Sequence, residues 1–379
     1  MPLLVLSGRR MKHIDSPAIY PLPSLGGGLA AVFIIATGAL LYKLRPDLYH
    51  QMTQEDGPVE WATFWSFLMS AFLFFAAAWP SEKPIWRGWF LWGVGLFCLF
   101  VGLEEISWGQ RLMGYQPPTY FLQNNYQQEL NLHNIAGKSF RVFALQAIML
   151  GYGFILPLVS GISMGRKFLE RLHIKTHSLS LAPPFLAASL LYKTYPWQYA
   201  GEWVEVLLGF CFLFSALELL FLARENFPPL WRKFLIIGGP LVIVLSGFAS
   251  TTFLQSSRAN DVEKENFAKQ ELKQLQSDFE THGLQTSCGL HKRIFTYAQK
   301  YKAVELRNGE FGRNLKKTGE DGRSEFFLDP WNTPYWVLHQ CSKKQVSRFL
   351  YSFGPNRQRD STDREVLGDD IGVYMGEGK

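Results

Sequence analysis

Long hydrophobic runs alternate with short polar segments along the chain as far as Gln255. A helix needs roughly 20 mostly apolar residues to cross a bilayer, because its backbone finds no water partner in hydrocarbon. The pattern therefore predicts about seven transmembrane helices. The fifth run is short and carries two prolines, so we expect it to be kinked or re-entrant. The runs lie at 24–43, 58–79, 88–105, 142–162, 179–192, 203–222 and 234–254.

The composition changes after Gln255: the remainder of the chain contains 20 Lys/Arg and 18 Asp/Glu and no comparable hydrophobic run. Leu272, Leu275 and Phe279 recur at helical spacing, which predicts an amphipathic helix that extends the last span and packs on the domain beyond. We therefore divide the chain into three parts. These are a transmembrane domain (1–255), an amphipathic connecting helix (256–283) and an outer domain (284–379).

The outer domain is expected to be α+β, so that the whole chain is an all-α membrane bundle followed by a small α+β domain. The stretch 286–311 is interpreted as the rest of its helical part. Short β-like runs separated by turn residues then predict a small sheet. These runs are "SEFFLDP", "PYWVLHQC", "SRFLYSFG" and "IGVYM".

Basic residues indicate the orientation. With seven spans and the N-terminus inside, twelve basic residues fall on the inner side and six on the outer side. This bias follows the positive-inside rule and makes the outer domain extracytoplasmic, whereas six spans would keep it in the cytoplasm. The net charge of +6 is largely this basic rim, so we expect no nucleic-acid partner. The inner residues are Arg9, Arg10, Lys12, Lys83, Arg87, Arg166, Lys167, Arg171, Lys175, Arg224, Arg232 and Lys233; the outer ones are Lys43, Arg45, Arg111, Lys138, Arg141 and Lys193.

The four cysteines divide between the two parts. Cys98 and Cys211 lie inside hydrophobic runs, where a thiol packs as a small apolar group. Cys288 and Cys341 lie in the outer domain, where oxidising conditions favour pairing. We therefore predict a disulfide between Cys288 and Cys341.

Polar residues gather at the outer ends of the spans. The third run ends in "FVGLEEISWGQR", which contains Glu104 and Glu105 side by side. If the helix continues, Glu104, Ser107, Trp108 and Arg111 share one face, and Arg111 would offset the cost of the carboxylates. The loop that follows is rich in Asn and Gln and is expected to fold back over the span ends. The remaining members of the cluster are Glu60, Gln110, Glu129, Asn131, His133, Asn134, Glu202 and Glu205.

Three interpretations of this cluster stay open. It can be a buried ion-pair and amide network that locks the helices together. It can be a divalent-metal or acid/base catalytic site formed by Glu60, Glu104, Glu105 and His133, since carboxylates and an imidazole serve both chemistries. It can also be a pocket for a ligand or lipid headgroup. The chain has no HExxH, GxSxG, Walker or CxxC motif that would support an enzyme.

"GLEEISWGQR" followed by "NLHN", with "EDGPVEW" before them, resembles a family of uncharacterised bacterial multi-span membrane proteins. The resemblance covers roughly residues 55–205. It implies that these blocks form a site, but the family has no assigned activity that would indicate its chemistry.

"LDPWNTPYWV", "YSFGPN" and "GDDIG" resemble the C-terminal domain of the major pseudopilin of type II secretion, over about residues 260–375. The resemblance implies a long helix followed by a small sheet, outside the cytoplasmic membrane. It also implies a calcium loop, although the loop here has become "RQRDSTDREVL", and a solvated loop of mixed charge is the alternative. No pseudopilin processing site precedes the seventh run, so we expect a permanently anchored domain. The candidate ligands are Asn356, Asp360, Asp369 and Asp370.

Together these observations predict a multi-pass protein of the bacterial inner membrane, in contact with membrane lipids. We expect a non-catalytic envelope component whose outer domain binds an envelope protein or acts as a sensor. The alternative is a membrane-embedded metal or acid/base enzyme that acts on a lipid or lipid-linked substrate at the outer face.

Overall fold

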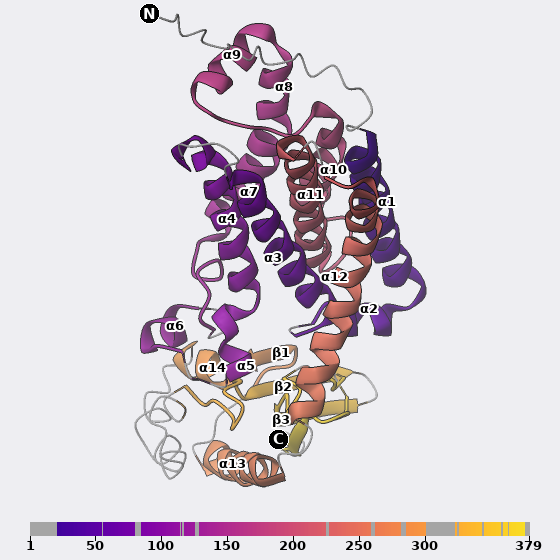
Figure 1. Cartoon of the computed structure of the whole chain (residues 1–379). Helices are drawn as coiled ribbons and strands as arrows, with labels where there is room; N and C mark the ends of the chain where they lie inside the picture. The colour runs from indigo at the N-terminus through magenta and orange to yellow at the C-terminus, as the bar shows by residue number, and fades with distance from the viewer. Residues whose placement is uncertain are drawn as a thin grey trace, which may run out of the picture.

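A computed structural model gives the arrangement of most of the chain (Figure 1). The residues that the structure describes are 21–54, 56–79, 85–113, 115, 117–125, 129–224, 227–258, 262–281, 286–300, 323, 326–342, 345–357, 359–362 and 364–375.

Among the described residues, five helical stretches are long and apolar enough to cross a membrane, which confirms five of the predicted spans. They are Leu22–Leu44, Pro58–Ala78, Ser139–Gly161, Ala200–Ala223 and Pro229–Ser256. They belong to α1 (Pro21–Leu44), α3 (Pro58–Ala78), α7 (Lys138–Leu150) with the π-helical turn η3 (Gly151–Ile155) and α8 (Leu156–Gly161), α11 (Ala200–Ala223) and α12 (Pro229–Arg258).

The other two predicted spans form shorter helices in the same bundle. The run 88–105 forms α4 (Trp89–Glu105), which follows the 3-10 turn η1 (Ile85–Gly88) and packs against α3. The run 179–192 forms the 3-10 turn η4 (Leu179–Leu181) and α10 (Ala182–Thr194), which packs against α11. Pro183 and Pro184 stand in the first turn of α10, where a missing N–H breaks no helical hydrogen bond.

Helix α11 is the centre of the bundle. In its most hydrophobic stretch 89% of residues are buried, against 22% in the corresponding stretches of α1 and α12. Helix α3 approaches α11 so closely at Gly209 that an added Cβ would lie 1.9 Å from Ser66 Oγ. The outward faces of α1 and α12 carry exposed Leu, Ile, Val and Phe side chains, which suit contact with lipid.

Short helices cap the two ends of the bundle. On the side of the C-terminal domain they are α2 (Pro46–Met52), the 3-10 turn η2 (Ser107–Gly109), α5 (Gln110–Met113) and α6 (Thr119–Asn124). At the opposite end lies α9 (Ser163–Arg171), which contains three basic residues (Figure 1).

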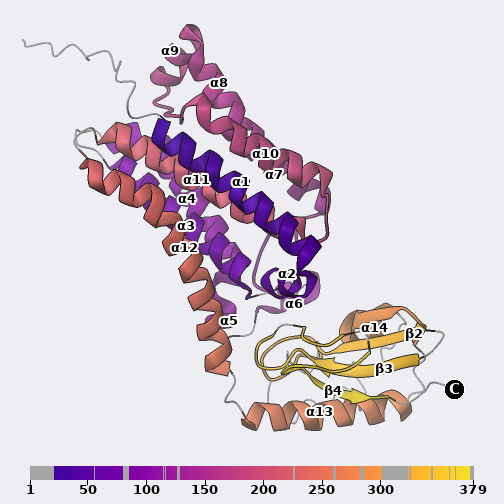
Figure 2. The same ribbon diagram turned by 90° about the vertical axis from the view of Figure 1, so that its right-hand side faces the viewer.

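The C-terminal domain is an antiparallel sheet in the order β1-β2-β3-β4 with a long helix, α13, against it (Figure 2). An α+β arrangement of a helix followed by a small sheet was predicted. The elements are α13 (Val262–Thr281), β1 (Leu290–Arg293), α14 (Ile294–Lys300), β2 (Trp336–Ser342), β3 (Gln345–Ser352) and β4 (Ile371–Tyr374). The register pairs Leu290 with His339, Val337 with Leu350, and Tyr351 with Gly372.

The apolar stripe of α13 packs into the core of this domain, as its spacing predicted. Leu272, Leu275 and Phe279 are fully buried, together with Val337 and Leu350 of the sheet. Burial of each large apolar side chain contributes roughly 1.5–3 kcal/mol to the free energy of unfolding. This stripe is therefore a main stabilising contact of the domain.

Three expectations about the C-terminal domain are wrong. Helix α13 does not extend α12 but is a separate helix that lies across its end (Figure 2). In the stretch 286–311, which was expected to be helical, Leu290–Arg293 form strand β1 ahead of α14, because "LHKR" gains its hydrogen bonds from β2. The run "SEFFLDP" forms only an isolated bridge between Leu328 and Pro334 within its described residues.

Candidate functional site

The chain turns sharply directly after Glu105. Helix α4 ends there, and the next residues include three with positive φ: Ser107 (47°), Trp108 (56°) and Gly109 (79°). Such angles are unfavourable for residues with a Cβ, and strained backbone of this kind is frequent at functional sites. The predicted continuous helical face of Glu104, Ser107, Trp108 and Arg111 is therefore wrong. The Arg111 side chain lies outside the described residues.

Glu104 is the buried anchor of the loop after α6. Its Oε2 accepts hydrogen bonds from the backbone N–H groups of Leu132 (2.6 Å) and His133 (3.0 Å). Its Oε1 accepts a hydrogen bond from Trp108 Nε1 (2.7 Å). Nδ1 of His133 lies 3.4 Å from Oε2, and the Glu104 side chain is only 4% exposed. The carboxylate is thus saturated by donors and holds the loop in place.

A second set of hydrogen bonds fastens the same loop. Ser107 Oγ donates to Glu129 Oε2 at 2.6 Å, and Asn131 Nδ2 donates to the same oxygen at 3.1 Å. The backbone N–H of Leu130 donates to Gln110 Oε1 at 2.7 Å. The loop therefore folds back over the end of α4, as the sequence predicted. This half of the cluster is the helix-locking network.

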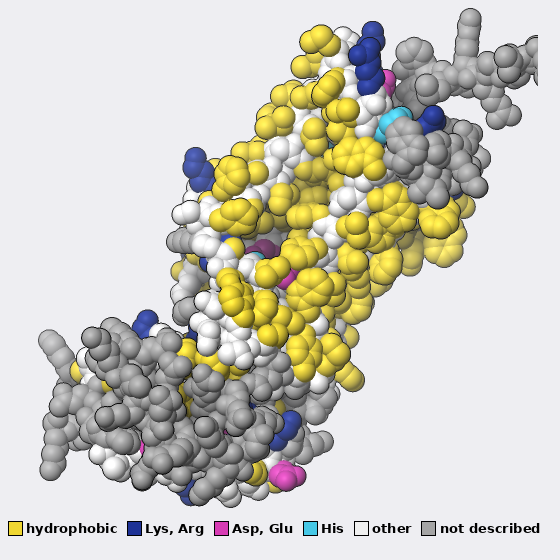
Figure 3. Space-filling model, turned by 90° about the vertical axis from the view of Figure 1, so that its left-hand side faces the viewer, with side chains coloured by type: hydrophobic (Ala, Val, Ile, Leu, Met, Phe, Trp, Pro, Cys, Tyr) yellow, Lys and Arg dark blue, Asp and Glu magenta, His cyan; other side chains and the backbone are white. Residues whose placement is uncertain are grey.

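The other half of the cluster faces a cavity of about 600 Å³ between the bundle and the C-terminal domain. Its acidic wall is formed by Glu60 of α3, Glu105 of α4, and Glu202 and Glu205 of α11. Figure 3 shows acidic and histidine side chains in a hollow of an otherwise largely hydrophobic face. The remaining lining residues are His50, Thr53, Gln54, Glu129, Asn131, His133, Asn134, Arg141, Gln198, Tyr199, His291, Trp336, Phe353 and Arg359.

Glu105 and Glu205 distinguish this cavity from a structural network. Neither makes a hydrogen bond or ion pair with any part of the chain that the structure describes. The charges that act on Glu105 are those of Glu205, Glu202 and Glu60, followed by Glu104. The groups whose positive charge acts on Glu205 are Arg141 and, when it is protonated, His133. Arg141 itself donates to Asn134 Oδ1 at 3.3 Å.

The carboxylates of the cavity are spread out rather than gathered around one point. Among the described residues, no three acidic, His or Cys ligand atoms in this cavity all lie within 4.8 Å of one another. Glu60 is drawn toward the preceding loop, where the N–H of Asp56 donates to its Oε2. Of Glu60, Glu104, Glu105 and His133, which were predicted as a metal or acid/base site, His133 and Glu104 come together, and the described ligand atoms form no closer group of three.

Several cavity residues could not be identified from the sequence. His291, Trp336, Phe353 and Arg359 come from the C-terminal domain, more than 150 positions along the chain from α4. Arg141 was recognised only as an outer-side charge. Their sequence context carries no sign of the contact, because it depends on how the sheet lies against the bundle.

Three aspartates of the predicted calcium loop do come together. Ligand atoms of Asp360, Asp369 and Asp370 lie within 4.8 Å of one another. Asn356 donates through its backbone N–H to Asp369 Oδ2 (2.8 Å) and through Nδ2 to Asp360 Oδ2 (3.0 Å). Burial, and then the nearby Asp360, raises the pKa of Asp369 to about 7, and burial raises the pKa of Asp370 to about 7. The donors suit calcium in kind, because it prefers carboxylate and carbonyl oxygens.

Two of the motif blocks in the C-terminal domain contact each other. Asp329 is fully buried and accepts hydrogen bonds from the N–H groups of Trp331 (3.0 Å) and Thr333 (2.8 Å). Ser352 Oγ donates to its other oxygen at 2.5 Å. Burial nevertheless raises the pKa of Asp329 to about 6.

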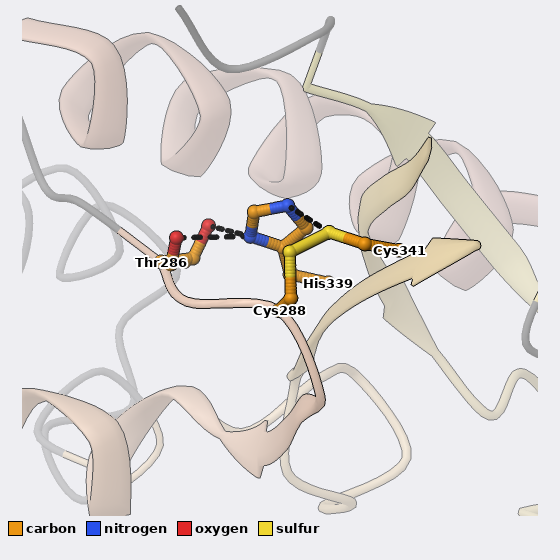
Figure 4. Close-up of a disulfide and its surroundings, with 4 residues drawn as sticks. All are labelled: Thr286, Cys288, His339 and Cys341. Atoms are coloured by element: carbon orange, nitrogen blue, oxygen red, sulfur yellow. Dashed lines mark hydrogen bonds between the residues drawn. A yellow bond between two sulfur atoms is a disulfide. The ribbon is translucent and has the colours of Figure 1, made fainter. Parts of the chain in front are cut away.

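Cys288 and Cys341 form a disulfide with a Cα–Cα distance of 5.3 Å (Figure 4). It ties the segment before β1 to β2. His339 lies beside the bridge, with Nδ1 2.7 Å from Thr286 Oγ1 and Nε2 3.5 Å from Cys341 Sγ. Because both thiols are used in the bridge, this Cys–His–Cys grouping is not a metal site.

A separate polar group lies at the opposite end of the bundle. Glu218 of α11 is fully buried and accepts hydrogen bonds from Ser178 through its N–H (2.6 Å) and Oγ (3.0 Å). Tyr152, in the π-helical turn, shares a 2.6 Å hydrogen bond with Ser215.

No protein-family model matches the chain, and no curated protein or solved structure is significantly similar to it.

Proposed function

We propose that this chain is a non-catalytic protein of the bacterial cytoplasmic membrane that binds a small organic cation between its helical bundle and its outer domain. Binding there would let the outer domain act as a sensor, or present a surface to another envelope protein. The resemblance to pseudopilins motivates the outer domain's proposed role in protein interaction.

The proposed topology has seven spans, with the N-terminus in the cytoplasm. Helix α10 and η4 support the fifth span, because they connect the same two levels of the bundle as α1 does. Ser180 pairs with Ser24 at the start of α1 (2.7 Å), and Gln198 accepts a hydrogen bond from Tyr49 beyond its end (2.7 Å). The bias of twelve inner against six outer basic residues then makes the C-terminal domain extracytoplasmic.

The environment of the Glu105 carboxylate is the observation that supports a bound cation. A carboxylate that faces a cavity, makes no hydrogen bond or ion pair with the described residues and is surrounded by acids is a suitable acceptor for a cation, which would stabilise its charged form. Among the described residues, the lining contains five glutamates and two arginines. An incoming positive charge would relieve this repulsion.

The size and walls of the cavity favour an organic cation over a bare ion. About 600 Å³ is typical of small-molecule sites, and the acids stand too far apart to surround one metal closely. Tyr199, Trp336 and Phe353 add aromatic surface, which attracts alkylammonium groups through cation–π contact.

An acid/base or metal-dependent enzyme is the second candidate. It is supported by the 3.4 Å approach of His133 Nδ1 to Glu104, at the edge of the cavity. The hydrogen bonds of Glu104 argue against an enzyme. Its carboxylate already accepts three hydrogen bonds from other donors, and such a carboxylate is better suited to hold the loop in position than to transfer a proton.

A thermal-shift screen of the detergent-purified full chain separates the two candidates. Ethanolamine, choline and spermidine are tested beside Mg²⁺, Mn²⁺, Zn²⁺ and Ca²⁺, and the metal content of the purified protein is measured. We expect an organic amine to raise the melting temperature of the wild type but not that of Glu105→Gln/Glu205→Gln. A near-stoichiometric metal that disappears in a Glu104→Ala/His133→Ala variant would favour the enzyme instead.

A further inference from the structure

Figure 2 shows α1 and α12 on one face of the bundle. An apolar groove runs between these two helices. Its volume is about 730 Å³, and its floor is formed by residues of α3 and α11 such as Ala62, Val206 and Phe210. Leu29 of α1 and Leu241 of α12 form its edges and are more than half exposed. Among the described lining residues, Thr37 supplies the only hydroxyl group.

The groove is long enough to hold an acyl chain of one membrane leaflet. Its α1 wall extends from Leu22 to Thr37, which at about 1.5 Å per residue is roughly 20 Å. The hydrocarbon core of a bilayer is about 30 Å thick, so an acyl chain of one leaflet reaches about half of that. An acyl chain of one leaflet would therefore occupy most of this groove.

A polar pocket continues the groove at the end nearest the C-terminal domain. The pocket has a volume of about 550 Å³ and shares Met52, Pro58 and Phe248 with the groove. Helix α2 contributes Gln51, and α12 contributes Thr251, Thr252 and Gln255. The C-terminal domain closes the pocket with three side chains, those of Asn356, Asp360 and Asp369.

The charges of this pocket are acidic. Asp360 and Asp369 line it, and no Lys or Arg is among its lining residues in the described part of the chain. Asp369 Oδ2 accepts the Asn356 N–H, whereas its Oδ1 is buried and has no hydrogen-bond partner among the described groups. A donor that carries positive charge would satisfy that oxygen.

We infer that the groove and the polar pocket together bind one phospholipid with a primary ammonium headgroup, from the leaflet on the side of the C-terminal domain. The acyl chain lies between α1 and α12. Gln51 and Gln255 offer amide N–H groups to the phosphate and ester oxygens. Asp360 and Asp369 accept hydrogen bonds from the ammonium group, so the lipid connects the bundle to the C-terminal domain.

This site is separate from the acidic cavity of the proposed function. The two share no lining residue, and they are tested by different variants. The lipid inference therefore stands or falls independently of the cation in the cavity.

Native mass spectrometry of the delipidated full chain tests the inference. Phosphatidylethanolamine and phosphatidylglycerol with identical acyl chains are added separately, in the presence of a calcium chelator. We expect the wild type to bind one phosphatidylethanolamine about tenfold more tightly, the ratio expected for one charge-assisted hydrogen bond. Equal binding of the two lipids would overturn the headgroup assignment, and this comparison needs no variant.

Two variants locate the site. Asp360→Asn/Asp369→Asn removes the headgroup preference but leaves acyl-chain binding, whereas Ala30→Phe fills the groove and weakens both lipids. The matched control is Glu263→Gln/Glu280→Gln, which removes two exposed charges from α13 and leaves both lipids unaffected. Unchanged binding in Ala30→Phe would overturn the groove. Selective phosphatidylglycerol binding that appears only with added calcium would show a cation-bridged anionic lipid, which also contradicts the inference.

Discussion

The carboxylate of Glu104 binds both the backbone and the side chain of His133: the N–H donates at 3.0 Å, and Nδ1 lies 3.4 Å from the same oxygen. This contact connects the end of α4 to a loop 29 positions along the chain. It separates the polar cluster into a saturated anchor, around Glu104 and Glu129, and an acidic cavity, around Glu105 and Glu205.

The anchor predicts a loss of stability when Glu104 is truncated. Glu104→Ala would leave the N–H groups of Leu132 and His133 and the indole of Trp108 without their acceptor. We expect a loss of about 3 kcal/mol, because unsatisfied donors to a charged acceptor cost about 1–3 kcal/mol each and partial rehydration offsets some of this. Thermal unfolding in detergent measures it, with Glu263→Ala on the exposed face of α13 as control. A melting temperature equal to that of the control would contradict the anchor.

The close approach of α3 to α11 predicts a compensating pair of substitutions. Gly209→Ala places a methyl group against Ser66 Oγ and should lower the melting temperature. Adding Ser66→Gly to the Gly209→Ala variant should restore part of the lost stability, because it removes the side-chain atoms that the new methyl group meets. A double-mutant cycle gives the coupling energy; strictly additive effects would mean that the two helices do not touch there.

The disulfide predicts both a thiol count and a stability effect. In denatured, unreduced protein two thiols should react, those of Cys98 and Cys211. Cys288→Ser/Cys341→Ser should destabilise the C-terminal domain by about 2–4 kcal/mol, the usual range for a bridge across a loop of this length. Reduction should reproduce the effect in the wild type and leave the variant unchanged. Four reactive thiols without reduction would rule out the bridge.

Because Asp329 is buried, we predict that the stability of the C-terminal domain falls with rising pH. Burial raises its pKa from 3.8 to about 6, so the folded state holds the proton more tightly than the unfolded state. The stabilising contribution is complete below pH 4 and is lost as the pH rises through about 6, by roughly 3 kcal/mol in total. Hydrogen–deuterium exchange of β2 and β3 between pH 4 and 7, corrected for the intrinsic rate, measures the slope. Asp329→Asn should flatten it; an identical slope in that variant would assign it to other groups.

The sequence predicted the features that depend on local pattern. The hydrophobic runs were found because the bilayer imposes its requirement on each span separately, and the stripe of Leu272, Leu275 and Phe279 was found because helical spacing alone defines it. Strand β1 was missed because its four residues are mostly polar and become a strand only by pairing with β2. The turn at Ser107–Gly109 was missed because "ISWGQR" also fits helical spacing, and Gly109 was its only local sign.

The cavity could not be predicted from the sequence, for a different physical reason. Glu105 and Glu205 could be placed at the same membrane level from their positions in the spans. Whether Arg111 or another cation neutralises them depends on tertiary contacts, and so does the wall formed by Trp336 and Arg359. The sequence therefore indicated where the charges gather, but not which of them lack a partner among the described residues.

The central claim is that the glutamates around Glu105 bind an organic cation. Isothermal titration calorimetry of the purified full chain with spermidine, at low ionic strength and with a chelator present, tests it most directly. We predict one saturable site in the wild type and in Glu263→Gln/Glu280→Gln, with affinity lowered at least about tenfold in Glu105→Gln/Glu205→Gln, since each lost charge-assisted contact costs about 1.5–3 kcal/mol. Equal affinity in all three proteins, or no heat of binding in the wild type, would contradict the claim.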